Sequence, residues 1–176
     1  LQAHYEFQSL ICQLTSMEVA NAGMYDGATS MAEAALMAAR VTKRNRVAVL
    51  DTVSPSYRKV LQTFVQSQGI GIDTYTPDSV NIGNETACLL VQQPNFLGYF
   101  ENMEAMAGEA RSNGALLTVG VDLTSLGMFR PPGDYDADIV VAEGQAMGVA
   151  PAFGGPYVGI FACKERYIRH MPGRVV

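Results

Sequence analysis

Short segments that are apolar from end to end alternate along the chain with segments of helical character. A strand with apolar side chains on both faces has to be covered on both faces, which is typical of parallel sheets in α/β proteins. The predicted strands are residues 46–50, 72–75, 86–91, 116–121, 137–142 and 157–162. This pattern predicts a mostly parallel sheet that right-handed crossovers connect and that helices cover on both faces. Ligands of such sheets bind beyond the carboxyl ends of the strands.

Helices are predicted in the intervals between these strands. Residues 1–15 place apolar side chains at helical spacing and polar side chains on the other faces. Further helices are predicted at residues 29–41, 55–68 and 100–112, and residues 165–170 are predicted to begin another. A chain of 176 residues that is 48% hydrophobic can form one buried core, so we expect a single domain over residues 1–176. Because the chain begins within a helical pattern and ends within an apolar run, we also expect N-terminal and C-terminal flanking regions to be absent.

The composition argues against several classes of function. The net charge is -5 and the isoelectric point is near 4.9. The basic residues are scattered except at Lys43, Arg44 and Arg46, so nucleic acid is not an expected partner. No apolar stretch approaches the roughly 20 residues of a membrane-spanning helix. Cys12, Cys88 and Cys163 lie in apolar runs without CxxC spacing, which indicates reduced thiols in a cytoplasmic protein. His4 and His170 have no metal-ligand neighbours in the sequence, so no metal site is predicted.

The segment YDGATSMAE at residues 25–33 places small residues and two hydroxyl groups at the expected start of a helix. Free N–H groups and the helix dipole can hold an anion such as phosphate at this position. Thr29 and Ser30 are also common capping residues, and Glu33 is spaced for a capping box. The sequence leaves both interpretations open.

Asp122 follows the predicted strand 116–121, at the carboxyl end where α/β proteins assemble their sites. A carboxylate at this position could pair with a cationic ring nitrogen or another base, but aspartate is also common as a plain turn residue. Asp134, Asp136 and Asp138 look similar but lie in a polar loop at the start of the next strand. We expect these three carboxylates to be solvated.

The segment EGQAMG at residues 143–148 is informative because of what it lacks. An enzyme that forms an imine with its cofactor needs an amine nucleophile at this edge of the sheet. The chain has three lysines, Lys43, Lys59 and Lys164, and none of them lies in this segment. The sequence therefore provides no covalent tether for an aldehyde cofactor at this position.

Two further loops are candidates for binding. The segment FGGP contains Gly154 and Gly155, which allow the backbone to approach a ligand or a neighbouring chain, although a tight turn is equally compatible. The segment PNFLG contains Asn95 and Phe96 and follows a predicted strand at its carboxyl end. Loops in this position usually carry binding residues.

Six segments together resemble a known enzyme family. They are LQAHYEFQSLICQLT, ANAGMYDGATSMAEAALMAA, LLVQQPNFLG, DADIVVAEGQAMG, FGGPYVGIFA and RHMPGRVV. In this order they are similar to the glycine cleavage system P protein, which is also called glycine dehydrogenase (decarboxylating). In some organisms this protein is split into two homologous subunits, and the segments resemble the first of them. The resemblance covers essentially all 176 residues. It implies the central part of the large domain of a fold-type-I pyridoxal-phosphate-dependent transferase.

In this family the second subunit binds pyridoxal phosphate through a lysine, and the first subunit does not. Active relatives carry a His-Lys pair where this chain reads Gln145-Ala146. The resemblance therefore implies that Ala146 occupies the position of the Schiff-base lysine. It also places Asp122 where active relatives have the partner of the pyridinium nitrogen. No catalytic residue is expected in this chain, and the cofactor is expected on the partner subunit.

The family reaction is the decarboxylation of glycine, followed by transfer of the aminomethyl group to the lipoyl group of the H protein. The resemblance implies a cytoplasmic heterotetrameric oxidoreductase in which this chain is a non-catalytic subunit. Its expected partners are the second subunit and the H protein, and it is expected to shape the wall of the partner's active site. The candidate residues for that wall, or for a vestigial cofactor site, are Tyr25, Asp26, Gly27, Thr29, Asn95, Phe96, Asp122, Gln145, Gly154 and Gly155.

Two alternatives stay open at this point. In the first, the chain is an autonomous pyridoxal-phosphate-dependent enzyme of fold type I, with a lysine such as Lys164 reaching back to the site. In the second, the residues form an inactive structural fragment of the parent protein. A lysine labelled by trapping the cofactor with borohydride would support the first alternative.

Overall fold

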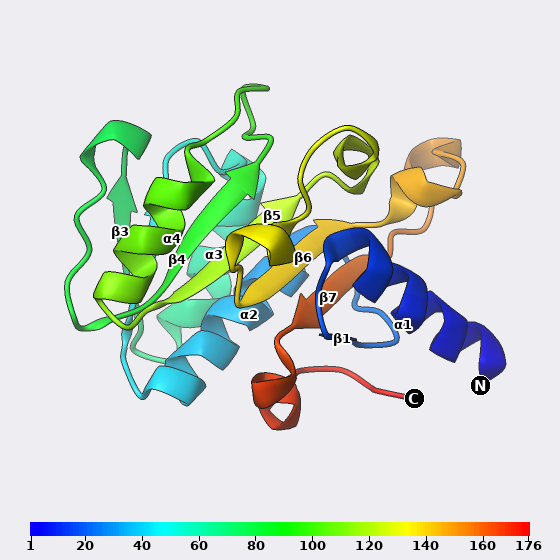
Figure 1. Cartoon of the computed structure of the whole chain (residues 1–176), viewed down its shortest axis with the longest axis horizontal. Helices are drawn as coiled ribbons and strands as arrows, with labels where there is room; N and C mark the ends of the chain where they lie inside the picture. The colour runs from blue at the N-terminus through cyan, green and yellow to red at the C-terminus, as the bar shows by residue number, and fades with distance from the viewer.

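A seven-stranded sheet lies at the centre of the computed structural model, which describes residues 1–176, and helices cover both faces of the sheet (Figure 1). The strands are β1 (Val19–Ala20), β2 (Arg46–Leu50), β3 (Gly71–Tyr75), β4 (Thr86–Gln93), β5 (Leu116–Val121), β6 (Ile139–Glu143) and β7 (Gly159–Cys163). Their order across the sheet is β1-β7-β6-β5-β4-β2-β3. The predicted α/β class is therefore confirmed.

The sheet is parallel except at one side. Strands β3, β2, β4, β5 and β6 run in one direction, and β7 is antiparallel to both β6 and β1. The connection from β6 to β7, residues 144–158, has no crossover helix. Because this connection returns at the edge where β6 ends, β7 has to run in the opposite direction.

The helices form two layers. Helices α2 and α3 pack against each other on one face of the sheet, and α1 and α4 lie on the other face (Figure 1). None of the helices has the length and apolar content needed to cross a membrane. The α-helices are α1 (Gln2–Thr15), α2 (Gly27–Thr42), α3 (Pro55–Gln66) and α4 (Met103–Ser112), and the 3-10 helices are η1 (Pro77–Ser79), η2 (Leu123–Gly127), η3 (Pro132–Tyr135), η4 (Gln145–Met147), η5 (Ala152–Gly154) and η6 (Glu165–His170).

Helix α2 is almost entirely buried between the sheet and α3. Its small residues allow this close approach, and the fully buried ones are Ala32, Ala34, Ala35 and Ala38. Met31 projects from the same helix onto the central strand β5, where a side chain at Gly120 would come within 2.7 Å of the Met31 methyl group. The Ala-rich and Met-rich composition of this segment thus fits a helix that is packed on two sides.

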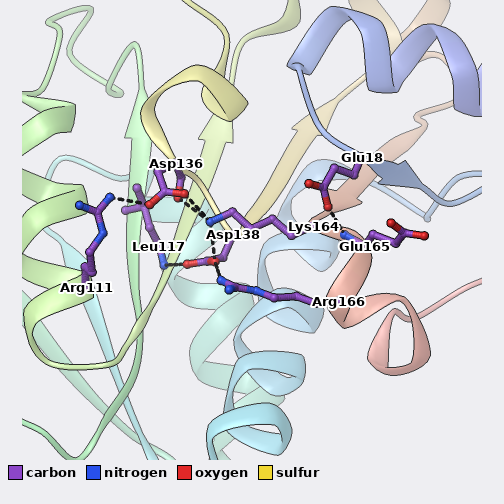
Figure 2. Close-up of polar contacts among 8 residues, drawn as sticks. All are labelled: Glu18, Arg111, Leu117, Asp136, Asp138, Lys164, Glu165 and Arg166. Carbon is purple, nitrogen blue, oxygen red and sulfur yellow. Dashed lines mark hydrogen bonds and ion pairs between the residues drawn. The ribbon is translucent and has the colours of Figure 1, made fainter.

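A network of charged side chains joins three strands at the amino edge of the parallel strands (Figure 2). Asp138 is only 7% exposed. Its carboxylate accepts hydrogen bonds from the backbone N–H of Leu117 at 3.0 Å and from Lys164 at 3.0 Å. Arg166 donates to the same carboxylate at 2.7 Å, and Lys164 also donates to Asp136 at 2.6 Å. Buried charges are tolerated when they are paired and hydrogen-bonded in this way.

The expectation that the three loop aspartates are solvated is wrong for Asp138. Asp136 keeps an exposed side chain, but it is paired with Lys164 and with Arg111 of α4. Only Asp134 is exposed and makes no side-chain hydrogen bond. The local polarity of the segment did not reveal that its carboxylates meet cations from α4 and from the end of β7.

All three cysteines are free. Cys88 and Cys163 are buried, and Cys12 is half-buried. Burial raises the pKa of the Cys88 thiol to about 12. At neutral pH the Cys88 thiol therefore stays protonated and packs as a small apolar side chain.

Candidate functional site

A cavity of about 270 Å³ lies where the carboxyl ends of β4, β5 and β6 meet α3. Open α/β sheets bind ligands at this edge. The lining residues are Tyr57, Gln92, Gly120, Val121, Asp122, Val141, Ala142, Glu143, Gln145 and Ala146. Three positions that the sequence singled out, Asp122, Gln145 and Ala146, are brought together here. We call this cavity the crevice.

Helix α2 begins beside the crevice with a capping box. Asp26 has the extended backbone that an N-cap requires, and its carboxylate accepts a hydrogen bond from the N–H of Thr29 at 2.7 Å. The Thr29 hydroxyl accepts in turn from the N–H of Asp26 at 3.2 Å. The capping box is therefore present, but its members are Asp26 and Thr29. Glu33 takes no part because the helix begins two residues earlier than the sequence pattern indicated.

Glu143, the last residue of β6, is a functional candidate that sequence reasoning missed. Its carboxylate accepts hydrogen bonds from three backbone N–H groups: Gly27 at 3.1 Å, Gln145 at 3.0 Å and Val158 at 3.1 Å. The signal was available, because Glu143 follows an apolar strand at its carboxyl end, as Asp122 does. Its partner Gly27, however, is 116 residues away in the sequence.

Gly27 packs directly against the end of β6. An added Cβ at Gly27 would lie 2.9 Å from the backbone nitrogen of Glu143 and would overlap the hydroxyl oxygen of Tyr57. Burial, together with the carboxylates of Glu143 and Asp26, raises the pKa of Tyr57 to about 12. The Tyr57 hydroxyl therefore stays protonated at physiological pH and lies beside the start of α2.

Asp122 lines the crevice, but its hydrogen bonds are those of a turn residue. Its carboxylate accepts from the N–H of Thr124 at 2.9 Å and from the hydroxyl of Thr124 at 2.7 Å. Asp122 is thus the N-cap of η2 and is exposed to solvent. Both interpretations of this residue remain compatible with its position, because one carboxylate oxygen caps the turn and the other has no protein donor.

The loop of residues 144–158 extends from the crevice. The Gln145 side chain donates a hydrogen bond to the carbonyl of Gly154 at 2.8 Å, which ties the loop to the crevice. Gly155 has a φ of 62°, and an added Cβ would lie 2.8 Å from the carbonyl oxygen of Ala150, so glycine is required there. Phe153 is fully exposed and has a φ of 52°, an unfavourable backbone region for a residue with a side chain.

Asn95, Phe96 and Tyr25 lie outside the crevice. Asn95 is buried, and its side-chain oxygen accepts hydrogen bonds from the N–H groups of Leu97 and Tyr99 at 2.9 and 3.0 Å. It therefore shapes its own loop. Phe96 is 57% exposed and Tyr25 is 80% exposed, so neither contributes to the crevice wall.

No lysine lies at the crevice. Lys164 follows β7 at the opposite edge of the sheet, where it is paired with Asp136 and Asp138 (Figure 2). Lys43 is the C-cap of α2, and Lys59 is exposed on α3. The alternative in which Lys164 reaches back to the site is therefore wrong. No group of three or more His, Cys, Asp or Glu side chains is placed to hold a metal ion.

Comparison with known proteins gives consistent matches over the whole chain. The family model of the glycine cleavage system P-protein matches residues 1–176. A relative from Desulforamulus reducens, named probable glycine dehydrogenase (decarboxylating) subunit 1, is 46% identical over 185 residues, which cover 100% of this chain and 42% of that protein. The chain thus spans less than half the length of the curated relatives it matches.

Solved structures agree with the sequence matches. A crystal structure of glycine decarboxylase (P-protein) in inhibitor-bound form superposes with a TM-score of 0.96 at 42% identity, covering 99% of this chain and 41% of that chain. A putative O-acetylhomoserine (thiol)-lyase from Campylobacter jejuni, with a pyridoxyl-lysine monophosphate group, superposes with a TM-score of 0.73 at 10% identity, covering 97% of this chain and 42% of that one. The fold is that of fold-type-I pyridoxal-phosphate-dependent enzymes.

The residues of the crevice do not fit pyridoxal phosphate. An aldehyde cofactor of this class is tethered by a lysine amine, and the crevice contains Ala146 and no lysine. A phosphate group would be expected at a helix start, but the N–H groups of Gly27 and Thr29 are already bound by carboxylates. The crevice lies at the edge of the sheet where this class of fold binds ligands. It lacks the lysine that would tether the cofactor.

Proposed function

Because the chain belongs to the glycine cleavage system P-protein family, we propose that it is part of the non-catalytic first subunit of glycine dehydrogenase (decarboxylating). The observation that carries this proposal is the crevice, which has Ala146 in place of an amine and Glu143 at the helix start. In this proposal, pyridoxal phosphate is held by the second subunit. The complex decarboxylates glycine and passes the aminomethyl group to the lipoyl group of the H protein.

Decarboxylation of glycine requires an electron sink for the electron pair that remains when carbon dioxide leaves. This chain has no group at its crevice that can hold such a sink. Its role is therefore structural: it stabilises the second subunit and forms part of the wall around that subunit's active site. The free cysteines support a cytoplasmic location for the complex.

The loop of residues 144–158 supports contact with the second subunit. It contains no charged residue, and Met147, Phe153 and Tyr157 are each more than half exposed. Aromatic residues and methionine are enriched in protein interfaces, whereas charged residues are depleted from interface cores. An apolar loop beside the crevice is thus suited to pack against a homologous subunit.

Reconstitution of the full-length proteins tests the proposal. We expect the full-length first subunit alone to release no labelled carbon dioxide from carboxyl-labelled glycine in the presence of lipoylated H protein. Mixing it with the full-length second subunit and pyridoxal phosphate should give release well above that of the second subunit alone. Turnover by the isolated first subunit, or no gain on mixing, would contradict the proposal.

A further inference from the structure

The start of α2 has the features of an anion site. Small residues, Gly27 and Ala28, form the first turn, and the helix begins at the carboxyl edge of the parallel strands. Helix starts in this position hold phosphate groups in many α/β proteins, because their N–H groups have no partner within the helix. In this chain the N–H groups of Gly27 and Thr29 already have partners.

Two carboxylates of the chain itself bind the first turn. Glu143 accepts from the N–H of Gly27 at 3.1 Å, and Asp26 accepts from the N–H of Thr29 at 2.7 Å. A phosphate ester would have to displace both hydrogen bonds and would be repelled by both negative charges. Of the two, Asp26 is an ordinary N-cap, whereas Glu143 comes from a different element.

Space is also filled at this position. The Gly27 Cα lies so close to β6 that an added Cβ would come within 2.9 Å of the Glu143 nitrogen and 3.1 Å of the Ala142 carbonyl carbon. The hydroxyl of Tyr57 closes the same space from α3. The crevice therefore ends at the Glu143 carboxylate and does not continue onto the helix start.

The other carboxylate oxygen of Glu143 closes the base of the loop of residues 144–158. It accepts from the N–H of Gln145 at 3.0 Å and from the N–H of Val158 at 3.1 Å, at the two ends of the loop. One side chain thus joins the helix start, the end of β6 and the start of the returning chain. Displacing it from α2 would loosen both ends of the loop.

We propose that Glu143 is an internal anion that takes the place of a phosphate ester at the start of α2 and so excludes phosphorylated cofactors from this subunit. This inference rests on the proposed non-catalytic function and names the residue that keeps phosphorylated cofactors out of this subunit. Glu143 is a positioning and specificity residue, because it contacts backbone N–H groups of its own chain and no reacting atom.

Phosphate binding by the full-length first subunit tests the inference, with inorganic phosphate as the probe and phosphorus NMR line broadening as the readout. We expect the wild type to bind phosphate only weakly. Glu143→Ala frees the N–H of Gly27 and removes a negative charge, so it should bind phosphate at least about tenfold more tightly. Glu143→Gln, which keeps the size of the side chain but loses its charge, should lie between the two.

Asp122→Ala is the matched control. It removes a carboxylate from the same crevice without freeing an N–H group of α2, so it should bind no more phosphate than the wild type. A gain in Asp122→Ala equal to that in Glu143→Ala would show that only the net charge matters and would overturn the inference. Equal phosphate affinity in the wild type and Glu143→Ala would overturn it as well.

Circular dichroism verifies that each variant is folded. If Glu143→Ala is unfolded, Glu143→Gln replaces it in the test and should also bind phosphate more tightly than the wild type. These outcomes are separate from the reconstitution assay. An isolated first subunit that turns over glycine contradicts the proposed function, whereas a phosphate affinity that is unchanged by Glu143→Ala contradicts only the role of Glu143.

Discussion

The two edges of the parallel strands use polar side chains in different ways. At the amino edge, Asp136 and Asp138 pair with cations from α4 and from the segment after β7, so charged side chains bind one another (Figure 2). At the carboxyl edge, Asp26, Asp122 and Glu143 bind backbone N–H groups at the starts of turns and helices.

The amino edge is held together by ion pairs, whereas the carboxyl edge is the one that we propose contacts the second subunit. The charge network of the amino edge joins β5, β6 and β7, whereas the carboxyl edge combines a crevice with an uncharged loop whose apolar side chains are exposed. A fold that binds ligands at its carboxyl edge has kept the layout of that edge here. Two N–H groups at the start of α2, those of Gly27 and Thr29, donate to the chain's own carboxylates.

The largest effect on stability is expected at the amino edge. Asp138→Ala leaves the N–H of Leu117 without its partner and removes the shared acceptor of Lys164 and Arg166. It should lower the free energy of unfolding by about 2–3 kcal/mol in urea denaturation. Asp134→Ala, at an exposed position in the same segment, should change it by less than about 0.5 kcal/mol. Equal losses of stability in the two variants would show that the charge network of the amino edge does not stabilise the fold.

Phe153→Ala in the full-length first subunit tests the carboxyl edge as a contact surface. If Phe153 packs against the second subunit, the variant should weaken binding of that subunit about 30-fold, which corresponds to about 2 kcal/mol. The melting temperature of the isolated first subunit should not change. Tyr5→Ala, which alters an exposed aromatic residue on α1, is the control and should leave binding unchanged. A lower melting temperature with unchanged binding would show that the loop packs within its own chain.

Gly27→Ala tests how tightly the crevice closes on α2. The added methyl group would overlap Tyr57 and crowd the backbone of Glu143, so the free energy of unfolding should fall by about 1–2 kcal/mol. Gly83→Ala is the matched control, because an added Cβ at Gly83 has no atom within 4 Å. If both variants are as stable as the wild type, the helix start has more room than the structure indicates.

The pH dependence of stability tests whether the ion pairs of Asp136 stabilise the amino edge. Hydrogen bonds from Lys164 and Arg111 lower the pKa of Asp136 below its ordinary value of 3.8. Its contribution to stability is therefore complete above that value and is lost as the pH falls through the lower folded-state pKa. Because the side chain is half exposed, the contribution should be below about 1 kcal/mol.

The measurement is a comparison of melting temperatures of the wild type and Asp136→Asn at pH 6 and near pH 3. The advantage of the wild type should be clear at pH 6 and should shrink at the lower pH. A wild-type advantage that grows on acidification would contradict the assigned direction of the pKa shift.

The smallest effect is expected from Ala146→Lys in the isolated full-length first subunit. The new amine would enter a crevice that Gln145 lines and in which the Glu143 carboxylate already binds the start of α2. Glycine decarboxylation should therefore stay at background, as measured by release of labelled carbon dioxide. Robust turnover by this single variant would show that the lysine is the one missing group.

Much of the fold could be predicted from local patterns. The predicted strands 46–50 and 116–121 have the same bounds in the structure as β2 and β5, because a buried parallel strand is apolar from end to end. The two-residue β1 was missed, since two residues carry no period. The helix predicted to begin at residues 165–170 is present as the 3-10 helix η6.

The site was predictable only in part. Asp122, Gln145 and Ala146 could be assigned to one edge because each follows a strand at its carboxyl end. The burial of Asp138 and the bond from Gly27 to Glu143 could not, since their partners lie 21 to 116 residues away along the chain. Long-range polar contacts leave no period in the sequence.

By itself, the sequence determined the α/β class, the edge of the sheet at which a ligand site would form, and the absence of a lysine from that edge. These follow from hydrophobic periodicity and from residue identity, which are local properties of the chain. Only the tertiary structure decided which carboxylates are solvated, which bind their own backbone, and that the start of α2 is closed by Glu143. Those outcomes depend on how distant segments pack, because an N–H group donates to whichever acceptor the fold brings within hydrogen-bond distance.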